Sequence, residues 1–305
     1  MSHRRHGDPL PLGDAELPYS KGLMARALIA VGVTADRAYS LARRIEVDLA
    51  ERRERTVDLV RLDELARETL GDKEGERAVK RLRRLADLQA LDVPLIVLIG
   101  GSTGTGKSTI AAEVAHRLGI TRVTSTDFIR QTMRAFFSEE FMPTIHRSSF
   151  AAGEAVVGEV KGDPTVVGFV EQSRHVSVGI DAAIRRALTE GWSIVLEGVH
   201  LVPGLVPTEV EGALVVHVIV AIPDEEAHRM HFHIRDVTTG GIRAMDKYLD
   251  HLDAIRTVQA HLVERAIREG VPVVENANVE RAIDEVVEHV LRAADRAAAR
   301  SSELA

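Results

Sequence analysis

The sequence predicts an α/β protein whose parallel sheet is covered by helices on both faces and is preceded by a small helical domain. Residues 1–20 are polar, contain proline and are expected to be irregular, and from Lys21 to Leu91 apolar residues follow a helical spacing with no convincing strand. From Val93 onward, short continuous apolar runs alternate with helical stretches, which is typical of parallel strands buried on both faces. Residues 101–108, GSTGTGKS, lie between the first of these strands and the next helix and have the spacing of a phosphate-binding loop.

These observations place domains at residues 1–92 and 93–305, and we expect the second domain to fold without the first. Within the first domain, Gly32 ends one helix and Thr34 is of the residue type that caps the next. The helices expected in this domain cover residues 21–31, 34–55, 62–70 and 74–88.

In the second domain, Gly191 ends the longest helix and Pro223 ends the longest strand. The last dozen residues are rich in Ala, Arg and Ser, and we expect them to fray. The expected strands are 95–99, 122–125, 193–196, 214–222 and 271–274. The expected helices are 109–118, 128–137, 166–188, 224–236, 249–269 and 279–294.

Composition excludes several classes of protein. Hydrophobic residues make up 45% of the 305 residues but aromatic ones only 4%, so the core must be mostly aliphatic. The chain has no cysteine, which excludes disulfides, thiolate metal sites and a cysteine nucleophile, and fits a cytoplasmic location. No apolar run approaches the roughly 18 residues that span a bilayer, and no secretory signal follows Met1, so we expect no membrane partner. A net charge of −7 argues against nucleic-acid binding, while the oligomeric state stays open.

The phosphate-binding loop predicts a nucleotide site. Its glycines let backbone N–H groups turn toward phosphate oxygens, and the helix that follows adds its positive N-terminal end. Lys107 can reach the β- and γ-phosphates, and the Ser108 hydroxyl can ligate Mg²⁺. A merely flexible loop would not need Lys-Ser after its last glycine. The residues expected to bind the nucleotide are Gly101, Ser102, Thr103, Gly104, Thr105, Gly106, Lys107, Ser108 and Thr109.

Asp127 follows the second strand, at the edge of the sheet where ligands bind in such folds. A carboxylate there can orient an acceptor hydroxyl or take its proton, although Asp127 could instead be a helix N-cap. Arg130 and Arg134 lie four residues apart on the following helix and suit a phosphorylated acceptor. The alternative for this pair is an ordinary solvated helix face.

Two further segments extend the predicted site. Glu197 ends a buried strand, where an acid can hold Mg²⁺ directly or through water, contact the acceptor, or serve only the structure. Between Phe136 and Pro164 the sequence is weakly patterned, which marks either a functional loop or a surface excursion. Its candidates for binding a small anionic substrate are Thr144, His146, Arg147, Ser148 and Ser149.

A mobile lid is expected after the longest strand. Arg229, Arg235 and Arg243 would bring cations onto the transferring phosphates, with Gly240 and Gly241 as a flexible turn. A metal site at His228, His231 and His233 is disfavoured because no acid or cysteine stands at ligand spacing.

Several of these segments together resemble the 2-phosphoglycerate kinase family, and the match spans nearly the whole chain in the expected order. The resemblance implies a P-loop kinase fold and phosphate transfer from ATP to 2-phosphoglycerate, giving 2,3-bisphosphoglycerate. It also places His200 among the substrate-binding residues. Residues 17–33 are similar to an ATP-cone, which implies nucleotide sensing by the helical domain. The kinase-like segments are residues 100–109, 125–130, 144–150, 196–200 and 248–256.

The sequence therefore predicts an ATP- and Mg²⁺-dependent small-molecule kinase that acts on a phosphorylated hydroxy acid. Lys107, Asp127 and Arg235 are its expected catalytic residues, and Arg229 joins the nucleotide site. One alternative acceptor is another phosphorylated polyol, such as an inositol phosphate. The other alternative is a nucleotide-dependent switch or regulatory ATPase, which would need no acceptor pocket.

Overall fold

The computed structural model describes residues 19–239 and 248–303, without the side chains of residues 234–239 and 301–303. The chain forms two compact units. One consists of Met1–Val93, Val114–Thr121 and Val287–Ala305, and the other of Pro94–Glu113 and Arg122–Val286. The expected domain boundary near Val93 stays a prediction, because the first unit also includes two later stretches of the chain.

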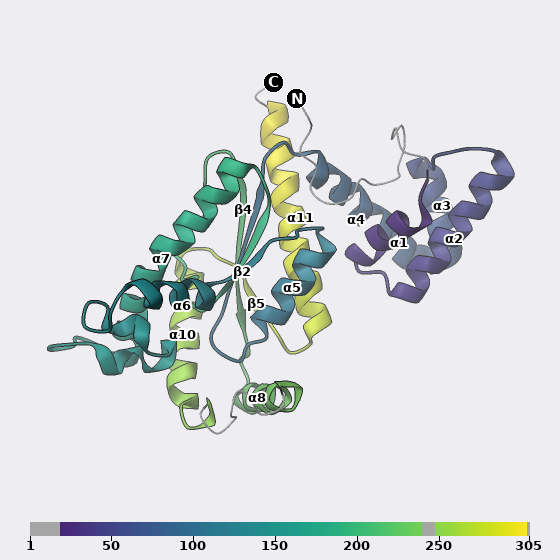
Figure 1. The fold of residues 1–305 in the computed structure, drawn as a ribbon. Helices are drawn as coiled ribbons and strands as arrows, with labels where there is room; N and C mark the ends of the chain where they lie inside the picture. The colour runs from purple at the N-terminus through teal and green to yellow at the C-terminus, as the bar shows by residue number, and fades with distance from the viewer. Residues whose placement is uncertain (1–18, 240–247, 304–305) are drawn as a thin grey trace. The chain divides into compact units, whose positions relative to one another are not determined.

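The first unit contains α1 (Lys21–Ala30), α2 (Ala35–Arg52), α3 (Leu59–Leu70) and α4 (Asp72–Ala90) (Figure 1). Ser20 caps α1 by accepting from the backbone N–H of Leu23, and Asp58 caps α3 by accepting from that of Arg61. Thr34 stands at the N-cap of α2, but its side chain makes no capping hydrogen bond.

The first unit also includes the second half of α11 (Val279–Glu303). Arg84 of α4 forms ion pairs of 2.9 Å with both Glu288 and Asp295 of that helix. Val290 and Leu291 are fully buried. The expectation that the last dozen residues fray is wrong for residues 294–303, which are helical, with Ala294 buried and Asp295 paired with Arg84.

The second unit is built on a five-stranded parallel sheet with the order β2-β3-β1-β4-β5. The register sets Ile99 of β1 and Ser125 of β2 opposite Glu197 of β3. The carboxyl ends of these neighbouring strands thus meet at one edge of the sheet, where such folds bind ligands. The strands are β1 (Leu95–Gly100), β2 (Val123–Ser125), β3 (Ile194–Gly198), β4 (Leu214–Ala221) and β5 (Val273–Glu275).

Helices cover both faces of the sheet, which confirms the predicted fold class. On one face lie α6 (Thr126–Phe136), α7 (Pro164–Glu190) and α10 (Leu252–Arg268), whose aliphatic side chains pack on β1, β3 and β4. The first turns of α5 (Lys107–Arg117) and α11 lie on the other face (Figure 1). The predicted strands and helices are present, with their ends shifted by up to three residues, except that α11 ends at Glu303 rather than at residue 294.

The weakly patterned stretch after α6 contains two short 3-10 helices, η1 (Pro143–His146) and η2 (Ser149–Ala155). Backbone approaches backbone closely where η2 meets α7, because a Cβ on Gly168 would lie 2.3 Å from the Gly153 nitrogen. Glycine at this crossing lets the loop lie against the long helix.

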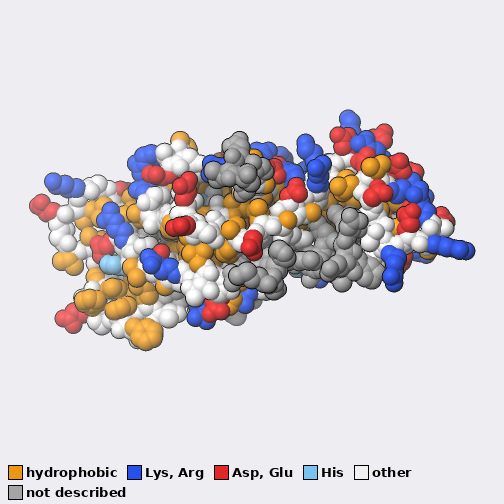
Figure 2. Space-filling model, turned by 90° about the horizontal axis from the view of Figure 1, so that it is seen from above, with side chains coloured by type: hydrophobic (Ala, Val, Ile, Leu, Met, Phe, Trp, Pro, Cys, Tyr) orange, Lys and Arg blue, Asp and Glu red, His pale blue; other side chains and the backbone are white. Residues whose placement is uncertain are grey.

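The first part of the predicted lid forms α8 (Glu225–Thr239). Gly240, Gly241 and Arg243 of the lid lie outside the described residues. No described helix is both long and apolar enough to cross a membrane. On the face seen in Figure 2, positively and negatively charged side chains are interspersed.

Candidate functional site

A polar cavity of about 300 Å³ lies at the carboxyl ends of the strands. It brings together the phosphate-binding loop, the start of α6, the loop before η2 and the end of β3. Segments that are far apart in the sequence therefore face one cavity. The lining residues are Thr103, Lys107, Ser108, Ser125, Asp127, Arg130, Ser148, Ser149, Phe150, Glu197, Gly198, Val199 and Tyr248.

The phosphate-binding loop has a backbone that favours glycine at Gly101, whose φ angle is 153°, and at two further points. Gly104 and Gly106 have φ angles of 86° and 81°. A Cβ on Gly104 would lie 2.4 Å from Cζ of Phe232, and one on Gly106 would lie 2.5 Å from Nδ2 of Asn276. A chain of backbone amides in this conformation is a suitable cradle for nucleotide phosphates.

Two side chains from distant segments hold the loop in this shape. Nδ2 of buried Asn276 donates to the carbonyl oxygen of Thr105 at 2.9 Å. Nε2 of His228 donates to the carbonyl oxygen of Thr103 at 2.8 Å. Burial lowers the pKa of His228, so its ring is held neutral. No sequence pattern predicted the role of Asn276. His228 binds the phosphate-binding loop, and it is not part of a group of metal ligands among the described residues.

Asp127 is not the N-cap of α6, which was the alternative to a catalytic role. Ser125 is the N-cap of α6, and its Oγ accepts from the Asp127 backbone nitrogen at 3.1 Å. The Asp127 carboxylate faces the cavity, 3.4 Å from Nε of Arg130. Desolvation by the surrounding protein acts to raise the pKa of this carboxyl, although its side chain is exposed to the cavity, but His200, Arg130 and Lys107 together lower the pKa. Since the His200 ring is itself neutral, we attribute the lowering to the two fixed cations.

Arg130 and Arg134 have different surroundings, although both lie on α6. Arg130 is only 8% exposed and lines the cavity, and its Nη1 donates to the carbonyl oxygens of Ile145 at 2.8 Å and Arg147 at 3.0 Å. Arg134 instead donates to Gln131 on its own helix and does not line the cavity. Arg130 therefore ties α6 to the loop that forms the other wall.

That loop contributes hydroxyl groups to the cavity. Ser148 and Ser149 line it together with Phe150, whose ring packs edge-on against that of Tyr248. His146 bonds to the carbonyl oxygen of Phe137, and Arg147 pairs with Glu139 at 3.0 Å. His146 and Arg147 do not line the cavity, and neither does buried Thr144.

Glu197 and His200 lie close in sequence but differ in exposure to the cavity. Glu197 lines it along with Ser108, so two oxygen donors of the kind Mg²⁺ prefers face the same space. His200 is fully buried outside the lining, and burial lowers its pKa to about 3. Both of its ring nitrogens make hydrogen bonds within the protein.

The predicted lid is described only in part. Arg229 pairs with Glu225 at 3.3 Å and Glu226 at 3.6 Å on its own helix and does not line the cavity. Arg235 belongs to the same helix, but its side chain lies outside the described residues. Among the described residues, no group of three or more His, Cys, Asp or Glu side chains could hold a metal ion.

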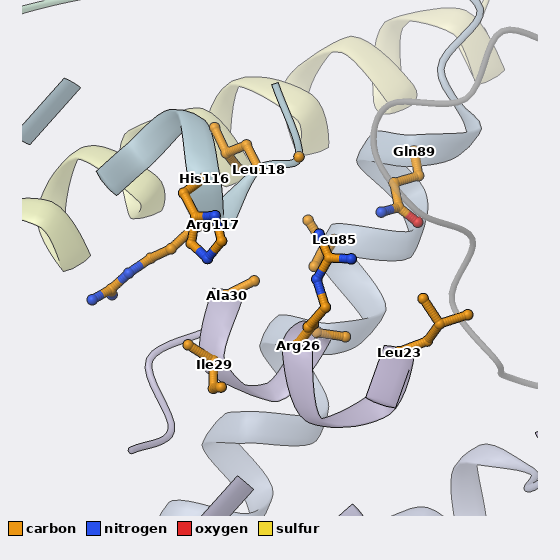
Figure 3. A pocket seen from close by; sticks show the side chains of 11 residues that line it. Leu23, Arg26, Ile29, Ala30, Leu85, Gln89, His116, Arg117 and Leu118 are labelled. Atoms are coloured by element: carbon orange, nitrogen blue, oxygen red, sulfur yellow. The ribbon is translucent and has the colours of Figure 1, made fainter. Parts of the chain in front are cut away.

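A smaller pocket lies within the first unit, between α1, α4 and residues 116–119 (Figure 3). Arg26, His116 and Arg117 line it beside apolar side chains such as Leu23 and Leu85. Its volume of about 60 Å³ is below the roughly 300–1,000 Å³ of typical ligand sites, so the larger cavity is the candidate active site.

Comparison with known proteins identifies close relatives over most of the chain. The chain is 37% identical over 279 residues to the 2-phosphoglycerate kinase of Pyrococcus furiosus, covering 92% of this chain and 91% of that one. It is 37% identical to the enzyme of the same name from Methanopyrus kandleri, covering 90% and 84%. The corresponding protein of Methanothermobacter thermautotrophicus is 36% identical, covering 90% of each chain.

Two further comparisons are less informative. The crystal structure of TT1252 from Thermus thermophilus is 22% identical, with a TM-score of 0.38, and the match covers 66% of this chain and 97% of that one. No protein-family model matches the chain.

Proposed function

Because the chain belongs to the 2-phosphoglycerate kinase family, we propose that it transfers the γ-phosphoryl group of ATP to the hydroxyl of 2-phosphoglycerate, giving 2,3-bisphosphoglycerate. The observation that carries this proposal is that the residues expected on the donor side and on the acceptor side line one polar cavity. Its lining includes Lys107 and Ser108 on the donor side, Asp127 between the two sides, and Ser148 and Ser149 on the acceptor side. A kinase needs both sides, whereas a nucleotide switch needs only the first.

On the donor side, the phosphate-binding loop would hold the ATP phosphates. Its glycines permit the required backbone, and Asn276 and His228 brace it from outside. Lys107 would stabilise the negative charge that develops on the transferring group. Bound Mg²⁺ would neutralise phosphate charge, and Ser108 and Glu197 are the residues that we expect to hold it.

On the acceptor side, the low pKa of Asp127 keeps its carboxylate ionised at neutral pH. An ionised carboxylate can accept a hydrogen bond from the acceptor hydroxyl and take its proton during transfer. The Ser148 and Ser149 hydroxyls and the Arg130 guanidinium supply donors for an anionic acceptor. We assign the transition-state role of the lid to Arg235, with Arg229 at the nucleotide, and both assignments stay predictions.

Turnover with defined acceptors tests the proposed function. ADP release would be measured with ATP alone and with added 2-phosphoglycerate, 3-phosphoglycerate or an inositol phosphate, and the product would be identified by phosphorus NMR. We expect turnover to require 2-phosphoglycerate. Lys107→Met should abolish it, because charge at the transferring phosphate is lost. Lys80→Met, at an exposed position on α4, is the matched control.

Each alternative predicts a different result in this assay. ATP hydrolysis that proceeds equally without any acceptor would indicate a regulatory ATPase. Turnover only with an inositol phosphate would move the assignment to another polyol. The relatives named above favour 2-phosphoglycerate over both alternatives.

Four finer assignments belong to this proposal as well: Mg²⁺ as the metal ion, a cytoplasmic location, no nucleic-acid partner, and an ATP-cone-like role for the helical domain at residues 1–92. The kinase domain would then comprise residues 93–305. Each stays a prediction from the sequence.

A further inference from the structure

Behind the acceptor wall of the cavity, three buried polar side chains form a continuous chain of hydrogen bonds. Oγ1 of Thr126 lies 2.9 Å from Nδ1 of His200. Nε2 of His200 lies 2.9 Å from Oε1 of Gln172. Nε2 of Gln172 then donates to the carbonyl oxygens of Thr144 and Arg147, the latter at 3.0 Å. None of the three side chains lines the cavity.

The chemistry of these groups allows only one direction of donation along the chain. Carbonyl oxygens can only accept, so the Gln172 amide nitrogen must face them and its oxygen must face His200. That oxygen accepts, so the proton of His200 is on Nε2. Nδ1 of His200 is then an acceptor, and the Thr126 hydroxyl donates to it. All three side chains are fully buried, so these hydrogen bonds satisfy polar groups that water cannot reach.

The two ends of this chain lie beside the two groups that an acceptor must meet. Thr126 directly precedes Asp127 at the start of α6. Thr144 and Arg147 flank the turn that leads into Ser148 and Ser149. The hydrogen bonds therefore connect the carboxylate side of the cavity with its hydroxyl side through α7 and the end of β3.

Gly198 leaves room for this connection at the end of β3. A Cβ at this position would lie 1.8 Å from Oγ1 of Thr126. The Thr126 hydroxyl thus occupies the space that a side chain on Gly198 would fill, on its way to His200. Arg130 tethers the same loop independently, through the carbonyl oxygens of Ile145 and Arg147.

We propose that Gln172, His200 and Thr126 are positioning residues for the acceptor: their hydrogen bonds hold residues 144–149 in register with Asp127. The expected effect on acceptor kinetics rests on the proposed function, whereas the expected effect on the order of residues 144–149 does not. We call the hydrogen bonds of Thr126, His200 and Gln172 the relay. The phosphate-binding loop is braced separately by Asn276 and His228, so loss of the relay should weaken binding of the acceptor and leave ATP binding in place.

The first test replaces Gln172 with Met, which has a similar size but cannot donate to the two carbonyls. We expect the Michaelis constant for 2-phosphoglycerate to rise about tenfold, because the carbonyl oxygens of Thr144 and Arg147 each lose one of two hydrogen bonds and the tie to α7 is broken, and that for ATP to change less than about twofold. Hydrogen exchange should become faster in residues 139–156 and stay unchanged in residues 101–109.

Ser173→Ala is the matched control on the same helix. Ser173 is equally buried, and among the described residues its hydroxyl has no hydrogen-bond partner. This variant should behave like the wild type in both kinetics and exchange. Equal shifts of both Michaelis constants in Gln172→Met, or unchanged exchange in residues 139–156, would overturn the proposal.

A second pair keeps the test decisive if Gln172→Met does not fold. Thr126→Val removes only the hydroxyl at nearly constant volume, and Thr126→Ser restores it. Acceptor binding should weaken in the first variant and recover in the second, whereas equal behaviour of the two would contradict the relay. Absence of 2-phosphoglycerate turnover in the wild type would instead refute the proposed function, while the exchange comparison would still test the relay.

Discussion

At the scale of single residues, the Asp127 carboxylate faces the cavity, is paired with Arg130 and does not cap α6. Since Ser125 already caps α6, Asp127→Asn removes charge without removing the cap. We expect stability to change by less than about 0.5 kcal/mol, because the position is exposed. Turnover should fall by about 10²–10⁴-fold if the carboxylate aligns or deprotonates the hydroxyl. Melting temperature and turnover of Asp127→Asn, measured on one preparation, test this prediction. Normal turnover in the variant would contradict a catalytic role for Asp127.

The two arginines of α6 lead to a second prediction at this scale. Arg130→Ala removes the side-chain donor to the buried carbonyl oxygen of Ile145 and leaves that of Arg147 with Gln172 alone, so we expect a loss of about 1–3 kcal/mol in unfolding free energy. The Michaelis constant for the acceptor should also rise. Arg134→Ala removes only a bond within the helix surface and should cost less than about 0.5 kcal/mol. Similar effects of both substitutions, in urea titration and kinetics, would contradict the distinct roles.

At the scale of elements, the crossing of α7 and η2 depends on glycine. Alanine favours a helix over glycine by about 1 kcal/mol, so local propensity predicts that Gly168→Ala stabilises α7. The Cβ, however, would lie 2.3–2.5 Å from backbone atoms of Ala152 and Gly153, which cannot move like a side chain. We expect packing to win, with a net loss of about 1–3 kcal/mol and weaker acceptor binding.

Gly22→Ala is the control for this substitution. A Cβ at Gly22 meets nothing within 4 Å, so the same change in α1 should be neutral or stabilising by up to about 1 kcal/mol. Thermal unfolding of both variants compares the two sites directly. A stabilised Gly168→Ala protein would show that η2 can shift away without cost.

At the scale of the whole molecule, buried neutral histidines set a dependence of stability on pH. Burial lowers the pKa of His200 to about 3 and that of His217 to about 4 from the ordinary value of 6.5. The unfolded chain therefore binds protons that the folded chain does not. Stability should be complete above about pH 6.5 and decline as pH falls toward 4, by up to about 1.4 kcal/mol per pH unit for each histidine.

Melting temperatures measured from pH 8 to pH 4.5 check this dependence. His217→Gln keeps a donor for the carbonyl oxygen of Leu201 but cannot take up a proton, so it should flatten the decline. His116→Gln changes an exposed histidine and serves as the control. An equally steep decline in the His217 variant would exclude this residue as a source.

The division into compact units leads to a further prediction at this scale. The sequence alone led us to expect that residues 93–305 fold by themselves. Val287, Val290 and Leu291 are buried, however, and belong to the unit that contains the N-terminal helices. Removing residues 1–92 should therefore expose apolar surface on α11, cause aggregation and lower the melting temperature. Size-exclusion chromatography and thermal unfolding measure this, and a monomeric fragment of unchanged stability would contradict it.

The sequence by itself determined the features that depend on neighbouring residues. The phosphate-binding loop, the buried strands and the long helix are each encoded within a continuous stretch, because periodicity and turn chemistry act over a few residues. Asp127, Arg130, Ser148 and Glu197 were selected for similar local reasons, and the structure brings them to one cavity.

Only the tertiary structure decided which side chains meet across the fold. Gln172 bonds to a histidine 28 residues away, and Asn276 bonds to a carbonyl 171 residues away. Which polar groups become partners depends on the strand order β2-β3-β1-β4-β5, and no local pattern encodes that order. For the same reason His200 became a buried support rather than a residue of the cavity wall, since burial and partners are properties of the assembled sheet and helices.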